Sequence, residues 1–416
     1  MGKPILIKKA FSSDIQYKLK NGAGSDAIHT APIYAYAVCK LATDMNMEGT
    51  GLAFTLGTGN NLVCQAIDYL VKHIEGREIN ELMSNFGQVS KTMADDPNFR
   101  WLGPHKGIVH LALASVTNAC FDLWAKANGV PLWKLLVDLP PKAIVDTLDL
   151  SYLEDVMTRE EAVSILQEAA STKNERNSIL GTGYRGYDTS IGWFNYSDDQ
   201  VADNIKKAMD RGFTAMKLKV GSEDPQRDVR RAQLVRHTAG DKATIMLDAN
   251  QQWHLLKAIE VCRELKSIDP YWIEEPTHPD DVGAHVTLAK KIAPLKLALG
   301  EHVPNRIIFK NYLQSGAIHF NQVDTVRVGG VAEFMAISLM SKKFGIPVVP
   351  HVGDMGQIHQ HLVLFNHIVI GHEAIFLEHI PHLTGYFKYP VQVVEGYYKV
   401  PQQPGMSTDL KNYKQY

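Results

Sequence analysis

Residues 214–220 read Thr-Ala-Met-Lys-Leu-Lys-Val, a short and mostly apolar run in which two lysines alternate with a leucine. A helical pattern covers residues 226–239, and a second apolar run, Ala-Thr-Ile-Met-Leu-Asp-Ala, follows at residues 243–249. Short apolar runs that alternate with helical patterns indicate parallel strands joined by crossover helices. This stretch therefore predicts the repeating unit of an α/β fold.

The same unit recurs through the second half of the chain. Candidate strands lie at residues 188–194, 214–220, 243–249, 270–275, 296–301, 318–324, 346–351 and 374–379. Helical patterns lie between them at residues 199–211, 226–239, 255–268, 281–292, 306–315 and 331–344. Eight strands spaced about 25 residues apart fit a TIM-like (β/α)₈ barrel, because an open doubly wound sheet usually has fewer strands and a glycine-rich phosphate turn. The sequence carries no such turn.

The first part of the chain has a different character. Strand-like patterns at residues 31–57 and helical patterns at residues 59–75 and 107–127 predict an α+β domain. We therefore expect an α+β domain at residues 1–150 and a barrel at residues 151–384. The final segment, residues 385–416, is expected to return and pack on the first domain.

Composition favours a small-molecule partner. The 416 residues carry a net charge of −2 and 45% hydrophobic residues, enough for a large core, and charges of both signs are interspersed. Neither a nucleic-acid-binding nor a membrane-binding surface is expected. The amino terminus lacks a signal-like segment, and no apolar run reaches about 18 residues. We expect a cytoplasmic protein and a homo-oligomer, with four reduced core cysteines.

Charged residues gather where the predicted strands end. They are Lys217, Lys219, Asp248, Glu274, Glu275, Glu301, Asp324 and His351. A single acid at a strand end can equally cap the following helix or form a salt bridge at the barrel rim, without any catalytic role. Groups at successive strand ends would instead converge on the barrel mouth where enzymes of this fold place their active sites.

Three of these acids predict a metal site. Asp248, Glu274 and Glu301 lie on adjacent strands and offer only hard oxygen ligands, which suit Mg²⁺, whereas zinc would favour His or Cys. His351 ends a strand of matching position, and His302 and His379 lie near such ends as candidates for substrate contact.

Lys217 and Lys219 flank Leu218 and so point to the same face of their strand. Two lysines inside a barrel are costly unless they act on something anionic, although a solvent-exposed pair at a strand end is the alternative. A nearby divalent cation and a second ammonium would lower the pKa of a lysine, so that its neutral amine could act as a base.

These motifs resemble, in order and spacing, the active site of the enolase superfamily, in its mandelate racemase-like group. The matching motifs are Lys217–Lys219, Asp248–Asn250, Glu274–Pro276, Gly300–His302, Gln322–Asp324 and Pro350–His351. Further stretches look like the L-fuconate dehydratase branch, namely Gly24–Ala27, Arg100–Pro104, Lys106–Leu111, Asp122–Lys126 and Gly192–Ser197.

The resemblance implies an enolase-type barrel whose mouth is closed by an α+β capping domain, formed by residues 1–150 and 385–416. It also implies Mg²⁺ on Asp248, Glu274 and Glu301, with an acid sugar as substrate. Bidentate binding of the carboxylate and 2-hydroxyl would make the C2 proton more acidic.

The implied reaction is dehydration of the sugar acid. Lys219 would remove the C2 proton while Lys217 holds the carboxylate. His351, oriented by Asp324, would protonate the departing 3-hydroxyl, and the product would become a 2-keto-3-deoxy sugar acid. Substrate contacts are expected from Asp26 and Tyr34 in the cap and from Asn250 and His302 in the barrel.

Two segments depart from the L-fuconate dehydratase pattern. Residues 351–357 read His-Val-Gly-Asp-Met-Gly-Gln where that branch usually has His-Ala-Gly-Gly-Val-Gly-Leu, so Asp354 is expected to add a charge near the pocket. Ile375 replaces an acid expected to face the sugar in the pattern Glu-Phe-Val-Asp-His. A pocket that loses a hydrogen-bonding partner rejects the substrate that needs it, so a substrate other than L-fuconate is expected.

Two alternatives remain open at this point. The same scaffold could epimerise or cycloisomerise a sugar acid, because Lys219 and His351 provide two opposed acid–base groups. A non-catalytic binding protein is disfavoured, because all three metal ligands and both acid–base groups are retained.

Overall fold

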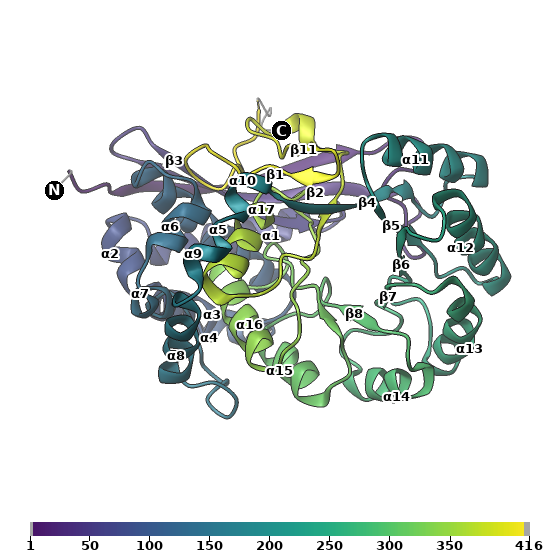
Figure 1. The fold of residues 1–416 in the computed structure, drawn as a ribbon. Coiled ribbons are helices and arrows are strands. Elements are labelled where there is room, and N and C mark those ends of the chain that lie inside the picture. The colour runs from purple at the N-terminus through teal and green to yellow at the C-terminus, as the bar shows by residue number, and fades with distance from the viewer. Residues whose placement is uncertain (1–2, 412–416) are drawn as a thin grey trace.

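The computed structural model describes residues 3–411 and begins with a three-stranded antiparallel sheet. Its strands are β1 (Ile7–Lys18), β2 (Ile33–Thr43) and β3 (Glu48–Thr55), with β2 in the centre. Val38 of β2 lies opposite Ser13 of β1 and Leu52 of β3. Figure 1 shows this sheet beside the carboxy-terminal segment, over one end of the barrel strands.

Helices complete the first domain. Their bounds are α1 (Asn60–Leu70), η1 (Val71–His73), α2 (Ile79–Ser84), α3 (Phe86–Ala94), α4 (Pro97–Leu102), α5 (Gly107–Ala127), α6 (Leu132–Asp138) and α7 (Pro141–Asp146). Within residues 3–411, α5 alone is long and apolar enough to cross a membrane, and 83% of its most apolar window is buried inside the protein. It packs on β3, where a methyl group on Gly51 would lie 1.9 Å from the Ser115 carbonyl oxygen.

The second domain is the predicted barrel. Its strands are β4 (Tyr184–Gly192), β5 (Ala215–Lys219), β6 (Thr244–Asp248), β7 (Trp272–Glu274), β8 (Leu297–Leu299), β9 (Phe320–Asn321) and β10 (Leu377–His379). They pair in parallel in chain order from β4 to β9, and β10 pairs with β4. The seventh predicted strand, residues 346–351, contributes a single bridge between Val348 and Asn321. The barrel prediction is confirmed, with a seventh strand that is barely formed.

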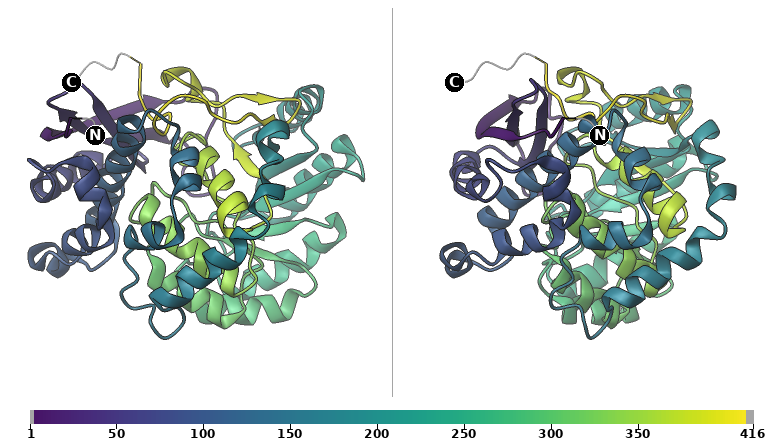
Figure 2. Two further views of the ribbon diagram at one scale, coloured as in Figure 1. Left: turned by 60° about the vertical axis from the view of Figure 1, so that its left-hand side comes forward. Right: turned by 90° about the vertical axis from the view of Figure 1, so that its left-hand side faces the viewer.

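Helices surround these strands, as Figures 1 and 2 show. They are α8 (Arg159–Ala170), α9 (Lys173–Arg176), α10 (Ile179–Thr182), α11 (Asp198–Asp210), α12 (Pro225–Ala239), α13 (Leu255–Leu265), η2 (Lys266–Ile268), α14 (Val282–Ile292), α15 (Arg306–Ser315), α16 (Val331–Lys343), α17 (His359–Phe365) and η3 (Asn366–Ile370). Polar side chains start several of them: Ser197 and Gln200 form a capping box at α11, and the Asn305 side chain accepts two backbone hydrogen bonds at α15.

The carboxy-terminal segment contacts both domains. It contains η4 (Thr384–Tyr386), β11 (Val393–Val394) and β12 (Tyr397–Tyr398), and β12 pairs with β4 of the barrel. Further on, the Asp409 carboxylate lies 2.9 Å from the Lys126 ammonium of α5. Residues near the chain end therefore link the cap helix α5 to the barrel.

The core is continuous from cap to barrel, since one buried cluster contains both Leu113 of α5 and Phe334 of α16. A separate cluster fills the inside of the barrel with side chains from its strands: Tyr187, Ala215, Met246, Trp272, Ala298, Phe320, Val349 and Phe376. The four cysteines are buried and free, as expected. The barrel interior is thus packed below the level at which its charged residues begin.

Candidate active site

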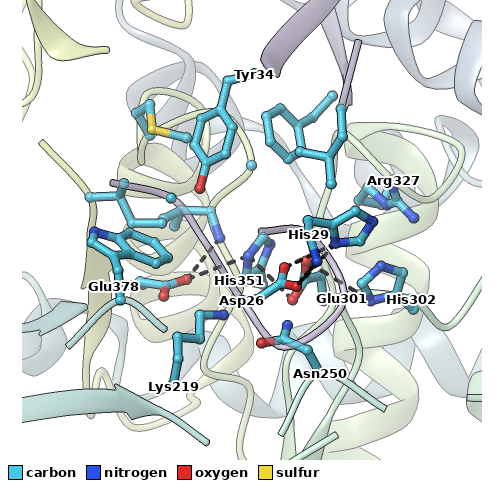
Figure 3. A pocket seen from close by; sticks show the side chains of 18 residues that line it. Asp26, His29, Tyr34, Lys219, Asn250, Glu301, His302, Arg327, His351 and Glu378 are labelled. Carbon is cyan, nitrogen blue, oxygen red and sulfur yellow. Dashed lines mark hydrogen bonds and ion pairs between the residues drawn. The ribbon is translucent and has the colours of Figure 1, made fainter. Parts of the chain in front are cut away.

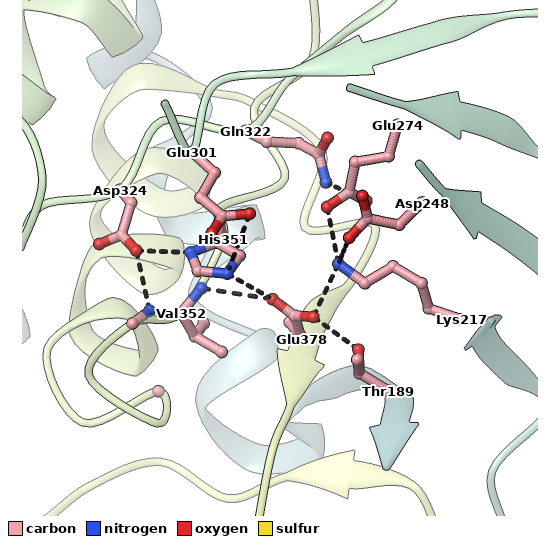
Figure 4. A network of polar contacts seen from close by, with 12 residues as sticks. Thr189, Lys217, Asp248, Glu274, Glu301, Gln322, Asp324, His351, Val352 and Glu378 are labelled. Atoms are coloured by element: carbon pink, nitrogen blue, oxygen red, sulfur yellow. Dashed lines mark hydrogen bonds and ion pairs between the residues drawn. The ribbon is translucent and has the colours of Figure 1, made fainter. Parts of the chain in front are cut away.

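Charged side chains from consecutive strand ends meet at one mouth of the barrel (Figure 4). Lys219 ends β5, Asp248 ends β6 and Glu274 ends β7, and the parallel register places these three side by side. Glu301 follows two residues after β8. Because a parallel barrel has all its carboxyl ends on one side, the spacing in the sequence becomes a cluster in space.

The predicted metal ligands converge. Each of Asp248, Glu274 and Glu301 offers one carboxylate oxygen, and these oxygens lie within 4.8 Å of one another. Asp248 and Glu274 are buried, and the Glu301 side chain is 14% exposed. Glu301 Oε2 is buried but accepts no hydrogen bond within residues 3–411. Three hard oxygen donors with an unsatisfied lone pair fit a small divalent cation such as Mg²⁺.

Neighbouring donors fix the orientation of Glu274. Its Oε2 accepts hydrogen bonds from Trp272 Nε1 at 3.0 Å and from Gln322 Nε2 at 2.8 Å. Its Oε1 lies 2.7 Å from the Lys217 ammonium. Partners that hold a ligating carboxylate in this way keep a metal site preorganised.

Both lysines point into the mouth and pair with carboxylates. Lys217 Nζ lies 2.7 Å from Glu274 and 2.8 Å from Glu378, while Lys219 Nζ lies 2.5 Å from Asp248. Burial lowers the pKa of Lys219, but the Asp248 carboxylate outweighs this and raises the pKa above its ordinary value. Among the protein groups alone, the attraction of Asp248 exceeds the repulsion of Lys217. The expected lowering, which depends on a bound divalent cation, stays a prediction.

His351 and Asp324 form the predicted pair. His351 Nδ1 lies 2.6 Å from Asp324 Oδ2, and the same oxygen accepts a hydrogen bond from the Gly353 amide at 2.8 Å. The other ring nitrogen, Nε2, lies 3.4 Å from Glu301 Oε2. Burial opposes the charged imidazolium, but Glu301, Glu378 and Asp324 outweigh it and raise the pKa of His351 to about 10. The histidine is thus held as a proton donor that faces the mouth.

Glu378 is a functional candidate that the sequence analysis missed. Its Oε1 lies 2.8 Å from Lys217 and accepts a hydrogen bond from Thr189, while its Oε2 lies 3.8 Å from His351. The sequence does mark Glu378, because it ends an apolar run in the same way as the other strand-end acids. His379, the neighbour favoured as a candidate instead, points the other way and stacks on Phe213, with ring centres 5.3 Å apart.

A pocket opens above these groups (Figure 3). Its empty volume is about 550 Å³, part of it open to solvent, which is the size of a small-molecule site. It is lined by Gly24, Asp26, His29, Tyr34, Phe54, Leu56, Trp193, Lys219, Asn250, Glu301, His302, Arg327, His351, Val352, Gly353, Met355, Glu378 and Ile380. Four of the five predicted substrate contacts are among them, with Asp26 and Tyr34 contributed by the cap. The fifth, Lys217, is fully buried behind the pocket and does not line it.

Hydrogen bonds hold several of the lining residues in place. Asp26 Oδ1 accepts from the backbone amides of Ile28 and His29 and its Oδ2 lies 3.0 Å from the His29 ring. His302 Nδ1 lies 2.9 Å from Glu275, whose carboxylate is buried. Burial lowers the pKa of His302, but Glu275 and Glu301 outweigh it and raise that pKa.

Both expected departures from the family pattern lie outside the pocket. Asp354 is fully buried beneath it, where its carboxylate accepts hydrogen bonds from the amides of Gly356 and Ile358 and lies 2.7 Å from His359. Ile375 packs against the cluster that fills the barrel below the mouth. Gly353 and Met355, on either side of Asp354, line the pocket, so the expected charge does lie near it, with its carboxylate outside the lining. The expected loss of a sugar contact at Ile375 is wrong, because that side chain lies outside the pocket.

Comparisons with known proteins agree with this geometry. Residues 200–414 match the family described as "Enolase C-terminal domain-like". Mitochondrial enolase superfamily member 1 of Homo sapiens is 42% identical over 399 residues, which are 94% of this chain and 90% of the relative. L-galactonate dehydratase of Hypocrea jecorina is 36% identical over 409 residues, which are 96% of this chain and 91% of the relative.

Solved structures give the same result. The crystal structure of human mitochondrial enolase superfamily member 1 superposes with a TM-score of 0.95 at 40% identity, covering 98% of this chain and 95% of that one. L-talarate/galactarate dehydratase from Salmonella typhimurium LT2, liganded with Mg and L-lyxarohydroxamate, gives a TM-score of 0.78 at 22% identity, covering 98% and 92%. The chain belongs to the enolase superfamily, in its mandelate racemase-like group.

Proposed function

We propose that this protein is a Mg²⁺-dependent hydro-lyase that converts an acid sugar into a 2-keto-3-deoxy sugar acid. The observation that carries the proposal is the placement of Lys219 and His351 on one pocket, with the three convergent carboxylates beside them. A base, an acid and a cation site in one cavity are the parts needed to remove a proton next to a carboxylate and to expel a neighbouring hydroxyl.

The two lysines have different roles in this reaction. Lys219 lines the pocket and removes the C2 proton, whereas Lys217 is fully buried between two glutamates and supplies a fixed positive charge for the substrate carboxylate. Burial lowers the pKa of Lys217, but Glu274 and Glu378 outweigh it and hold that pKa well above its ordinary value. Lys217 therefore stays charged behind the pocket and attracts the substrate carboxylate, while Lys219, which lines the pocket, reaches the proton.

His351 delivers the proton that allows the 3-hydroxyl to leave as water. Asp324 fixes the ring by its Nδ1, so that Nε2 faces the cavity. Asp248, Glu274 and Glu301 would hold Mg²⁺, which when bound takes up carboxylate charge, lowers the pKa of Lys219 and stabilises negative charge on the deprotonated acid.

We propose a six-carbon acid of L-galacto configuration as substrate, with L-fuconate preferred. Support comes from the similarity to a relative named L-galactonate dehydratase, since L-fuconate is the 6-deoxy form of L-galactonate. The apolar side chains of Phe54, Leu56 and Met355 line the pocket and suit a terminal methyl group better than a hydroxymethyl group. Neither Asp354 nor Ile375 opposes this substrate, because both lie outside the pocket.

The experiment is a product assay with purified protein, Mg²⁺ and L-fuconate, L-galactonate or galactarate. A keto-deoxy product that reacts with semicarbazide, formed fastest from L-fuconate, is the expected result. Chelation by EDTA should stop the reaction and Mg²⁺ should restore it. Failure of all three acids to give a keto product would contradict the proposed function.

A second outcome of the same assay would favour an epimerase or cycloisomerase. Lys219 and His351 both face the pocket, so proton removal from one side and return from the other is sterically open. Run in deuterium oxide, the dehydratase loses water, whereas an epimerase exchanges the C2 proton and retains all hydroxyl groups. Deuterium at C2 without keto product would replace the dehydratase assignment.

The cation site has its own test. Mg²⁺ should raise the melting temperature of the protein, because a ligand that binds only the folded state stabilises it. Asp248→Asn should weaken the apparent Mg²⁺ affinity by at least about tenfold. Asp224→Asn, at an exposed surface position, is the matched control and should respond like the parent protein.

A further inference from the structure

Arg327 is a cation in the pocket that the proposed mechanism does not use. It lies three residues after Asp324, in the segment that follows β9, and lines the cavity together with His29 and His302. In Figure 3 its side chain lies beside these two histidines, on the opposite side of the view from Lys219 and Glu378. The basic side chains therefore form one wall of the pocket, away from the proposed base.

Within the described part of the chain, the guanidinium of Arg327 has neither a carboxylate in ion-pair range nor a hydrogen-bond acceptor, and its Nε is buried without a partner. Other buried arginines are paired: Arg306 lies 3.0 Å from Glu333 and 2.6 Å from Asp149. A half-buried guanidinium without acceptors loses hydration without compensation. The guanidinium carries five N–H donors, and those on its two terminal nitrogens are open to a molecule in the pocket.

The backbone holds Arg327 firmly at this place. The Arg327 amide donates to the Asp324 carbonyl at 3.0 Å, and the neighbouring Val326 amide donates to Asp324 Oδ1 at 2.9 Å. The Val326 carbonyl in turn accepts from the Phe54 amide of the cap strand at 3.2 Å. The residue is thus tied both to the carboxylate that orients His351 and to the cap, which preorganises its donors for a ligand.

We infer that Arg327 binds the hydroxyl groups of the acid sugar beyond C3 and so determines how long a polyol chain the enzyme prefers. The inference rests on the proposed function, in which Lys217 and the carboxylate triad take up the C1 end of the substrate. The planar fork of donors suits the oxygens of two adjacent hydroxyl groups. A shorter acid lacks these hydroxyl groups and would leave the Arg327 donors unpaired, so the enzyme would disfavour it.

The test compares a long and a short ligand in matched variants. L-fuconate carries hydroxyl groups beyond C3, whereas the three-carbon acid glycerate has every group that the reaction uses and none beyond C3. Arg327→Met should lower kcat/KM for L-fuconate about 10- to 100-fold. The inhibition constant of glycerate should change by no more than about twofold. Arg327→Lys should recover only part of the loss, because lysine offers a point charge.

Arg230→Met, an exposed arginine on α12, is the control and should behave like wild type with both ligands. Equal losses with glycerate and L-fuconate would overturn the inference, because Arg327 would then only support the structure. No loss with either ligand would also overturn it. A wild-type preference for the diacid galactarate that disappears in Arg327→Met would assign the guanidinium to a second carboxylate instead of to hydroxyl groups.

Product formation by the wild-type protein is measured first, because it tests the proposed function separately from the role of Arg327. If no acid gives a keto product, the inference is decided by calorimetric titration of L-fuconate and glycerate in the presence of Mg²⁺. Weaker binding of L-fuconate alone by Arg327→Met supports it, and unchanged binding of L-fuconate overturns it.

Discussion

At the scale of single residues, each buried charge in the mouth is balanced by an opposite one. Lys217 lies between Glu274 and Glu378, Lys219 faces Asp248, and His351 faces Asp324. Ionised groups in a low-dielectric interior persist only when paired in this way. The arrangement keeps the two lysines and His351 charged before a substrate or cation arrives. Burial and the Asp248 carboxylate raise the pKa of Glu274 to about 8. Arg327, which has no such partner, is the exception.

The acid–base roles predict distinct losses. Lys219→Ala and His351→Asn should each lower kcat by about 10²- to 10⁴-fold, because each removes one proton-transfer group. Lys219→Ala should also abolish exchange of the C2 proton with solvent. His351→Asn should retain this exchange, because Lys219 still removes the C2 proton. Keto-product formation and nuclear magnetic resonance in deuterium oxide measure the two effects.

Folding must be checked in the same samples, since Lys219→Ala leaves Asp248 without its lysine. Lys219→Met, which keeps the length of the side chain, is the matched second variant. Ordinary turnover by either lysine variant with an intact melting transition would contradict the role of Lys219. Ordinary turnover by His351→Asn would contradict the role of the histidine.

At the scale of elements, the strand ends were predictable and the loops were not. Lys219, Asp248 and Glu274 could be placed from the sequence because each terminates an apolar run in a regular strand–helix repeat. His29 and Arg327 lie in irregular segments, whose side-chain directions depend on contacts made far away in the chain. Ile375 was misplaced for the same reason, because the sequence pattern does not show which side of this segment faces the cavity.

Asp354 is predicted to support the turn before α17. Its carboxylate accepts three amide hydrogen bonds, from Gly356, Ile358 and His359, and pairs with the His359 ring. Asp354→Ala should destabilise the protein by about 2–4 kcal/mol, because buried donors are left without acceptors. The relative kcat/KM values for different sugar acids should stay unchanged. Denaturant unfolding and a substrate panel check both parts, and a change in substrate preference without destabilisation would contradict this role.

The contact between β3 and α5 predicts a second structural effect. A Cβ on Gly51 would lie 1.9 Å from the Ser115 carbonyl oxygen and 2.3 Å from the Ala119 amide nitrogen, and both atoms belong to helix backbone that cannot move aside. Gly51→Ala should therefore cost about 3 kcal/mol or more. Gly181→Ala, where nothing lies within 4 Å of the new methyl group, is the control. Equal melting temperatures for the two variants would contradict the close packing.

At the scale of the whole molecule, the pocket exists because two domains meet over it. Lys219, Glu301 and His351 come from the barrel, whereas Asp26 and Tyr34 come from segments of the cap. The chemistry of the barrel groups could be anticipated from their spacing. The shape of the cavity could not, because it depends on how the cap docks and on contacts such as the hydrogen bond from Phe54 to Val326.

A buried network of charged side chains holds the cap on the barrel. Glu333 of α16 lies 2.6 Å from the His110 ring of the cap helix α5 and 3.0 Å from Arg306, which in turn lies 2.6 Å from Asp149. Burial opposes ionisation of Glu333, but His110 and Arg306 outweigh it and hold its pKa well below the ordinary value. Glu333→Gln should lower the free energy of unfolding at neutral pH by about 3 kcal/mol.

The pH dependence of that loss follows from the direction of the shift. A carboxyl group whose pKa is lower in the folded state stabilises the protein above its unfolded pKa, and this contribution fades as the pH falls toward the folded pKa. The difference between wild type and Glu333→Gln should therefore be constant above about pH 5 and shrink below about pH 4. Urea unfolding across this range measures it, with the exposed Glu154→Gln as control. A difference that grows on acidification would show that Glu333 is not held as a carboxylate between the cap and the barrel.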